Sequence, residues 1–195
     1  MNRAGILFLG DSISLGYRDI VKYNLRGCCE VLFPREQGKF ASDLYRMLYE
    51  WKKYVTCDRQ IDMVYWNAGL WDVVRIFGDE AQTSVDDYKK YLEKVCLRLR
   101  KLFPKAKICF ATTTPVVEER YTDEFFRKNS DIEKYNKAAE CVLKDKVDFF
   151  DDLYSFMQNI EAKNYRDATH FTYDANQKIA AHICGIIRNT FKDEI

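Results

Sequence analysis

The stretch Phe8-Leu9-Gly10-Asp11-Ser12-Ile13-Ser14-Leu15-Gly16, close behind the N-terminus, decides the fold. The unbroken apolar run before its turn, residues 5–9, predicts a buried strand. Gly10, Asp11 and Ser12 suit a tight turn that caps a following helix. Open α/β sheets bind ligands at this edge, and a helix N-terminus favours negative charge. Helix capping and nucleophilic catalysis are therefore both open for Ser12.

The length and composition predict one soluble globular domain spanning residues 1–195. The formal net charge of +1 gives no basis for a nucleic-acid partner. No segment has the roughly 20 consecutive apolar residues that span a bilayer, and we expect no signal peptide ahead of the first strand. The seven cysteines include no C-x-x-C pair and are expected to be reduced. We expect a cytoplasmic protein without a membrane partner, and the oligomeric state does not follow.

Apolar runs and helical periodicity alternate about five times along the chain, which favours a parallel sheet with helices on both faces. The expected strands are residues 5–9, 28–33, 61–66, 106–112 and 147–150. The expected helices are residues 15–26, 40–55, 85–102, 132–142 and 175–187, with a small helical piece at 152–160. The charged and aromatic segment 116–129 shows no clear periodicity and is predicted as a loop over the sheet edge. The fold class is α/β, a flavodoxin-like three-layer α/β/α sandwich with about five parallel strands.

A second candidate site lies near the C-terminus, in Tyr165-Arg166-Asp167-Ala168-Thr169-His170-Phe171-Thr172. The three-residue spacing lets the Asp167 carboxylate bond the His170 imidazole and fix its tautomer. An isolated pair of this kind is more often a loop histidine near a capping aspartate. A serine nucleophile, however, needs a base within reach and an orienting group for that base. Because both stretches fall in loops at the same predicted sheet edge, together they favour a catalytic site.

Gly10-Asp11-Ser12-Ile13 and Asp167-Ala168-Thr169-His170 resemble the motifs of the SGNH or GDSL-type serine esterases and lipases. The resemblance covers nearly the whole chain and implies the SGNH hydrolase fold. It also implies that Ser12 is the nucleophile, His170 the base and Asp167 the group that orients the base. The oxyanion hole would use the backbone N–H groups of Ser12 and Gly38. Gly38 equally fits an ordinary turn glycine.

The chain departs from this family at Gly69-Leu70-Trp71-Asp72, where the usual motif is Gly-x-Asn-Asp. Tryptophan occupies the position of the asparagine that donates the third oxyanion hydrogen bond. Asn67, at the expected end of the third strand, gives the variant Asn-x-Gly-Leu-Trp-Asp and is one candidate for this donor. In the alternative, Trp71 lines the substrate pocket together with Asp72, and the hole has only backbone donors. Loss of one such donor costs about 10²–10³ in kcat.

Other chemistries lack their motifs in this sequence. There is no P-loop, no dinucleotide fingerprint and no G-x-S-x-G elbow. Asp151 and Asp152 could bind a metal with Asp167. The preferred interpretation is that both are solvated charges at the end of a strand and the start of a helix. His182, beside the apolar stripe of the last helix, is interpreted as a packing or surface residue. No metal is expected.

The function that follows is hydrolysis of carboxylic esters through an acyl-serine intermediate, with a small-molecule ester as substrate. The mechanism requires no metal or organic cofactor. Short acyl or O-acetyl esters, such as those on carbohydrates, are favoured because no broad apolar lid is evident. Acyl transfer from the same acyl-serine to another alcohol is one alternative. A non-catalytic binding module of the same fold is another, motivated by the tryptophan in the asparagine position.

Overall fold

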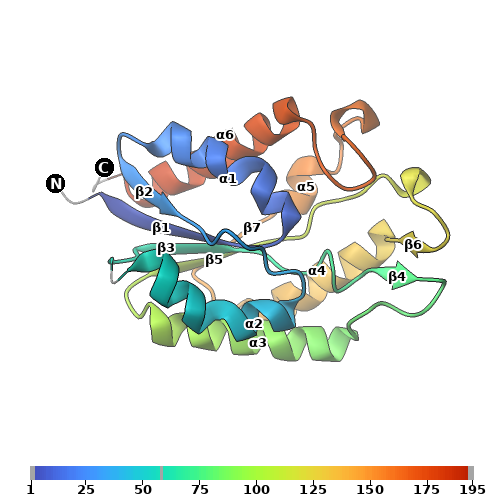
Figure 1. Ribbon diagram of the computed structural model, residues 1–195, viewed down its shortest axis with the longest axis horizontal. Helices are drawn as coiled ribbons and strands as arrows, with labels where there is room; N and C mark the ends of the chain where they lie inside the picture. The colour runs from blue at the N-terminus through green and yellow to red at the C-terminus, as the bar shows by residue number, and fades with distance from the viewer. Residues whose placement is uncertain (1–2, 58, 193–195) are drawn as a thin grey trace.

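The computed structural model describes residues 3–57 and 59–192 and contains a five-stranded parallel sheet between two layers of helices (Figure 1). The strands are β1 (Ala4–Leu9), β2 (Cys29–Leu32), β3 (Met63–Trp66), β5 (Lys107–Ala111) and β7 (Phe149–Asp151). They lie in the order β2-β1-β3-β5-β7, and all neighbours are parallel. This is the flavodoxin-like strand order, which confirms the predicted α/β/α sandwich.

Helices cover both faces of the sheet, with α1 and α6 packed together on one face and α2, α3 and α4 on the other (Figure 1). Their bounds are α1 (Ser12–Leu25), α2 (Ala41–Trp51), α3 (Val85–Leu102), α4 (Asn129–Leu143), α5 (Leu153–Met157) and α6 (Tyr173–Thr190). A π-helical turn, Lys52–Thr56, continues α2. No helix in the described part of the chain has the length and apolar character needed to cross a membrane.

The two central strands end level with each other. β1 is buried along its whole length, and it pairs with β3 so that Leu9 lies opposite Trp66. The turn after β1 and the turn after β3 therefore leave the sheet side by side, at its carboxyl edge. The chain runs to β2 on one side of β1 and to β3 on the other, so this edge is the switch point where such sheets bind ligands.

The structure differs from the sequence predictions in two places near this edge. Helix α1 begins at Ser12 instead of residue 15, because the Asp11 carboxylate accepts the Ile13 N–H at 3.0 Å and caps it. The predicted loop 116–129 contains a 3₁₀ turn, Glu118–Arg120, and a short strand, β6 (Phe125–Phe126). β6 pairs antiparallel with β4 (Arg75–Ile76) beyond the ends of the main strands (Figure 1). Two-residue strands are too short to give a periodic signal.

Candidate active site

Ser12 is the first residue of α1 and is separated from the buried strand β1 by the two-residue turn Gly10-Asp11. Asp11 supplies the cap of this helix, so the Ser12 hydroxyl is not needed for capping. As the first N–H of the helix, the Ser12 N–H has no acceptor within it. The side chain is partly exposed at the carboxyl edge of the sheet. Asp11 therefore accounts for helix capping, and the Ser12 hydroxyl remains available for a chemical role.

The structure brings Ser12 together with the C-terminal motif, 158 residues later in the chain. His170 Nε2 lies 2.8 Å from Ser12 Oγ, and His170 Nδ1 lies 2.8 Å from Asp167 Oδ2. A carboxylate beside Nδ1 holds the proton on that nitrogen, which leaves Nε2 as the acceptor for the serine hydroxyl. The three side chains therefore form one hydrogen-bonded chain with the polarity that a general base requires.

Asp167 is held in its ionised form by the loop around it. Its Oδ1 accepts the N–H groups of Thr169 and His170, at 2.8 and 2.7 Å. Partial burial raises the pKa of Asp167, but these backbone hydrogen bonds, with that of the imidazole, outweigh the burial and lower its pKa overall. A carboxylate that stays charged keeps the imidazole oriented and stabilises the imidazolium that forms during proton transfer.

The loop that contains Asp167 is braced by the segment that was predicted only as a loop over the sheet edge. Arg120 donates to the carbonyl groups of Ala162, Tyr165 and Asp167, at 2.8, 3.0 and 3.1 Å. Tyr121 Oη and Thr169 Oγ1 are hydrogen bonded at 2.6 Å. Neither side chain belongs to a recognisable sequence motif, so the sequence offers no signal for these positioning contacts.

Asn67 lies directly after β3 and against Gly10 in the turn before Ser12. A Cβ at Gly10 would come within 2.0 Å of Asn67 Oδ1, so the close approach of the amide depends on glycine at this position. Burial raises the pKa of the Asp11 carboxyl, and the nearby Asn67 side chain opposes that rise. An amide nitrogen carries two N–H bonds, so Asn67 Nδ2 is a candidate donor to a ligand beside Ser12.

Gly38 lies near the same turn, but its N–H already has an acceptor. It donates to the Gly10 carbonyl at 3.0 Å. This bond ties the segment before α2 to the turn that contains Ser12. The Gly38 N–H is therefore not a free oxyanion donor in the structure, which corrects the sequence prediction for this residue.

The two residues predicted to line the pocket behave differently. Trp71 is partly exposed and packs near the rings of Phe40 and Phe125, whose centroids lie 6.1 and 6.4 Å from its own. Asp72 is fully buried, and its Oδ2 accepts the N–H of Ala41, the first residue of α2. Burial raises the pKa of Asp72 to about 6. A side chain without exposed surface cannot touch a substrate, so the prediction for Asp72 is wrong.

Comparisons with known proteins give the fold a name. No protein-family model matches the chain, and no curated protein is close enough in sequence to count as a relative. Among solved structures, the chain is similar to the acetyl xylan esterase AlAXEase, at 19% identity over 94% of this chain and 99% of that one, with a TM-score of 0.73. A lipase/acylhydrolase from Enterococcus faecalis is 20% identical over 96% of both chains, also with a TM-score of 0.73. A carbohydrate esterase family 3 structure from Talaromyces cellulolyticus is 16% identical over 98% and 100%, with a TM-score of 0.69. The chain has the SGNH hydrolase fold.

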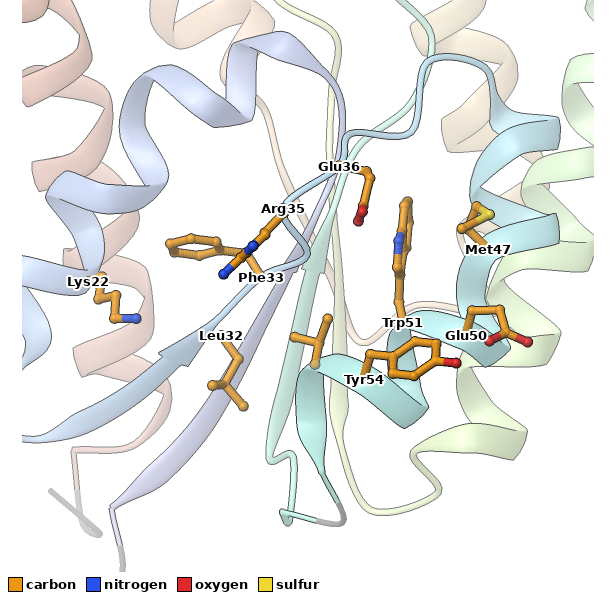
Figure 2. Close-up of a pocket in the computed structure, with 10 residues that line it drawn as sticks. Lys22, Leu32, Phe33, Arg35, Glu36, Met47, Glu50, Trp51 and Tyr54 are labelled. Atoms are coloured by element: carbon orange, nitrogen blue, oxygen red, sulfur yellow. The ribbon is translucent and has the colours of Figure 1, made fainter.

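Of two cavities in this SGNH fold, one is lined by motif residues and the other is not. A cavity of about 250 Å³ adjoins the candidate site and is lined by residues that include Ser12, His170 and Arg166. A roomier cavity of about 570 Å³ lies beside edge strand β2, where Phe33 and Trp51 are among the lining residues (Figure 2). None of the three motif side chains lines this second cavity. Of these two cavities, the smaller one adjoins Ser12.

The acidic pair considered as metal ligands has other partners in this SGNH fold. Asp151 is buried and not solvated, and it accepts hydrogen bonds from Tyr65 Oη at 2.6 Å and His182 Nε2 at 2.7 Å. Asp152 caps α5 by accepting the Ser155 N–H at 3.1 Å. Within residues 3–57 and 59–192, no group of three or more side chains has the arrangement of a metal site.

Proposed function

We propose that this chain is a serine esterase that hydrolyses small carboxylic esters through an acyl-serine intermediate. The observation that supports it most strongly is the hydrogen-bonded chain from Ser12 Oγ to His170 Nε2 and from Nδ1 to Asp167, with both links at 2.8 Å. Serine is a weak nucleophile on its own, and this arrangement supplies the base and the orienting carboxylate that it needs. The solved structures with the same fold are described as esterases and a lipase/acylhydrolase, which fits this proposal.

In the first half of the proposed reaction, Ser12 Oγ attacks the ester carbonyl carbon while His170 Nε2 takes the hydroxyl proton. The tetrahedral intermediate collapses as His170 returns that proton to the leaving alkoxide, which departs as the alcohol. In the second half, His170 deprotonates a water molecule that attacks the acyl-serine. The acid is then released, and Ser12 regains its proton.

The oxyanion of each tetrahedral intermediate needs hydrogen-bond donors beside Ser12. We assign the Ser12 N–H, which starts α1, and the Nδ2 amide of Asn67. The N-terminal end of a helix also favours the negative charge. Gly38 holds the turn through its bond to Gly10 and is left out of the hole.

Short acyl groups on a carbohydrate are the proposed substrates. The cavity of about 250 Å³ beside Ser12 is small, and the partly exposed indole of Trp71 offers a flat apolar face of the kind that packs against a ring. Two of the solved structures of similar fold are named as an acetyl xylan esterase and a carbohydrate esterase. Acetate release from acetylated xylo-oligosaccharides, compared with hydrolysis of long-chain p-nitrophenyl esters, tests this preference.

The experiment that tests the mechanism combines labelling with kinetics. A serine-reactive fluorophosphonate should form its adduct on Ser12, and Ser12→Ala should lower kcat on p-nitrophenyl acetate by up to about 10⁶-fold. Ser155→Ala, which removes an exposed hydroxyl on α5, is the matched control and should keep the parent rate. An adduct on another residue, or a Ser12→Ala variant as active as the parent, would exclude the mechanism.

A further inference from the structure

Arg127 is a buried cation in the loops above the carboxyl edge of the sheet. Only 4% of its surface is exposed. Nε donates to the Leu70 carbonyl at 2.5 Å, and Nη1 donates to Tyr121 Oη at 3.1 Å. Nη2 has no hydrogen-bond acceptor among the described residues. It also keeps some exposed surface, because it is absent from the set of fully buried atoms that lack a partner. The small exposed part of the side chain therefore includes a guanidinium nitrogen that is free to donate.

No carboxylate pairs with this cation in the described part of the chain, in contrast to Arg75, which pairs with Asp131 at 2.8 Å. Arg127 lowers the pKa of the Asp11 carboxyl, but burial has the larger effect and raises that pKa overall. Neither oxygen of Asp11 bonds to Arg127, because Oδ1 accepts the Ile13 N–H and Oδ2 has no partner. A guanidinium withdrawn from water without a bonded counter-ion is costly, and a ligand carboxylate would remove that cost.

A second cation lies against the same aromatic side chain. Arg127 Cζ is 5.5 Å from the ring centroid of Trp71, and Nζ of the exposed Lys39 is 4.9 Å from it. Lys39, like Arg127, has no acidic partner among the ion pairs of residues 3–57 and 59–192. The partly exposed indole is thus flanked by two positive charges.

Hydrogen bonds connect the segments of Arg127 and Lys39 to the two parts of the candidate active site, the loop of Asp167 and the turn before Ser12. From Arg127, the contacts run through Tyr121 Oη to Thr169, whose N–H donates to Asp167. On the other side, Lys39 directly follows Gly38, whose N–H is bonded to the nucleophile turn. Both cations are therefore on segments that are tied to the candidate site, Arg127 to the loop of Asp167 and Lys39 to the turn before Ser12.

We propose that Arg127 and Lys39 bind a carboxylate of the substrate, so that the preferred esters carry a negative charge near the scissile bond. The inference rests on the proposed esterase function and deepens it. Because Nε and Nη1 are already bonded, Nη2 and the lysine ammonium offer a small donor set that suits a single carboxylate. The carboxylate belongs either to the acyl group, as in a dicarboxylic half-ester, or to the alcohol, as in an acetylated uronic acid.

The test compares charged and neutral esters of matched size, with acid release followed in a pH-stat. One arm uses acetylated glucuronic acid against acetylated glucose, and the other uses ethyl hydrogen glutarate against ethyl 5-methylhexanoate, in which an isopropyl group replaces the carboxylate. For the parent protein, kcat/KM for the charged ester divided by kcat/KM for the neutral ester should exceed one in one of the two arms. That arm shows whether the bound carboxylate belongs to the alcohol or to the acyl group. Arg127→Met should lower this ratio by about 10- to 100-fold, the effect of one charge-assisted hydrogen bond, and Arg127→Lys should restore part of it. Lys39→Met should lower it less, because that side chain is exposed.

The matched control is Arg98→Met. Arg98 also donates to a carbonyl and to a tyrosine hydroxyl, both of Tyr45, and lies over that ring at 3.7 Å, but it is on α3. Its loss should leave the ratio at the parent value. A purely structural role for Arg127 would change charged and neutral turnover alike, so an unchanged ratio in both arms overturns the proposal. So does a parent that prefers the neutral ester in both arms.

A binding measurement keeps this inference separate from the proposed function. Calorimetric titration of glucuronate and of glutarate into Ser12→Ala should detect binding of one of them, and the added Arg127→Met change should weaken it by about 10-fold or more. Binding that is absent, or equal with and without Arg127, overturns the carboxylate site. If the parent hydrolyses no ester at all, the proposed function fails, and this titration still decides whether the subsite exists.

Discussion

Replacing Gly10 with alanine should disable the Asn67 amide without removing any group that takes part in the proposed chemistry. A Cβ at this position would lie 2.0 Å from Asn67 Oδ1 and 3.0 Å from its Cγ. Non-bonded contacts of this kind require more than about 3 Å, so the amide must shift by roughly 1 Å. Asn67 is 6% exposed, and the packed interior gives it little room to relax. A 1 Å misplacement of an active-site group is enough to cost about 10²-fold in rate.

We therefore expect Gly10→Ala to lower kcat on p-nitrophenyl acetate by about 10²-fold, with a loss of about 1–3 kcal/mol in the free energy of unfolding. Asn67→Ala alone should lower kcat by about 10²–10³-fold. In the double variant the clash is gone, because alanine at 67 has no amide to displace. Its kcat should equal that of Asn67→Ala, and its stability should exceed that of Gly10→Ala. Steady-state kinetics and urea unfolding of the four proteins complete this cycle.

Two outcomes would refute the reasoning. An Asn67→Ala variant with the parent kcat would remove Asn67 from the oxyanion hole. Losses that multiply in the double variant would show that the new methyl group acts by another route, such as the Ser14 Cβ at 3.3 Å or the hydrogen bond from Gly38.

Two further predictions concern the histidines. Asp167→Asn should lower kcat on the order of 10⁴-fold, because an amide no longer fixes the Nδ1–H tautomer of His170, and a pH–rate profile should show the loss across the whole range; a loss below tenfold would contradict this role. The hydrogen bond to Asp151 raises the pKa of His182 above its ordinary value of 6.5, so the stabilisation from this pair is complete below that value and is lost as pH rises through the higher folded-state pKa. The difference in unfolding free energy between the parent and His182→Ala, from urea titrations, should accordingly be larger at pH 5.5 than at pH 9; a difference that does not change with pH would contradict the pairing.

The sheet and the edge that carries the motifs could be predicted because their signals are local. A buried strand needs only a short apolar run, and an amphipathic helix needs only its own periodicity. Once the strands are taken as parallel, the rules for their connections bring Ser12 and His170 to one edge without any knowledge of the packing. The separation of 2.8 Å between Ser12 Oγ and His170 Nε2 agrees with that topological argument.

What could not be predicted depends on partners far away in the sequence. Gly38 was expected to point its N–H at a substrate, but the Gly10 carbonyl takes it, and no pattern in either segment indicates this bond. Asp72 directly follows a partly exposed tryptophan, yet its carboxylate turns inward to the N–H of Ala41. Asp151 is buried because a tyrosine and a histidine from other elements meet it there. Polar side chains in short loops carry no periodicity, so their burial is decided by tertiary contacts alone.

The tryptophan in the asparagine position acquires a consistent role when the two proposals are combined. A short amide at position 71 could not reach both Phe40 and Phe125, whose ring centroids lie 6.1 and 6.4 Å from that of the indole. Nor could it offer an aromatic face to Lys39 and Arg127. With the donor moved back to Asn67, where glycine at position 10 leaves room for it, position 71 is released from the oxyanion hole. Under the two proposals, the same loop stabilises the transition state at one end and selects the charge of the substrate at the other. The departure from the usual motif is then a redistribution of roles and not the loss of one.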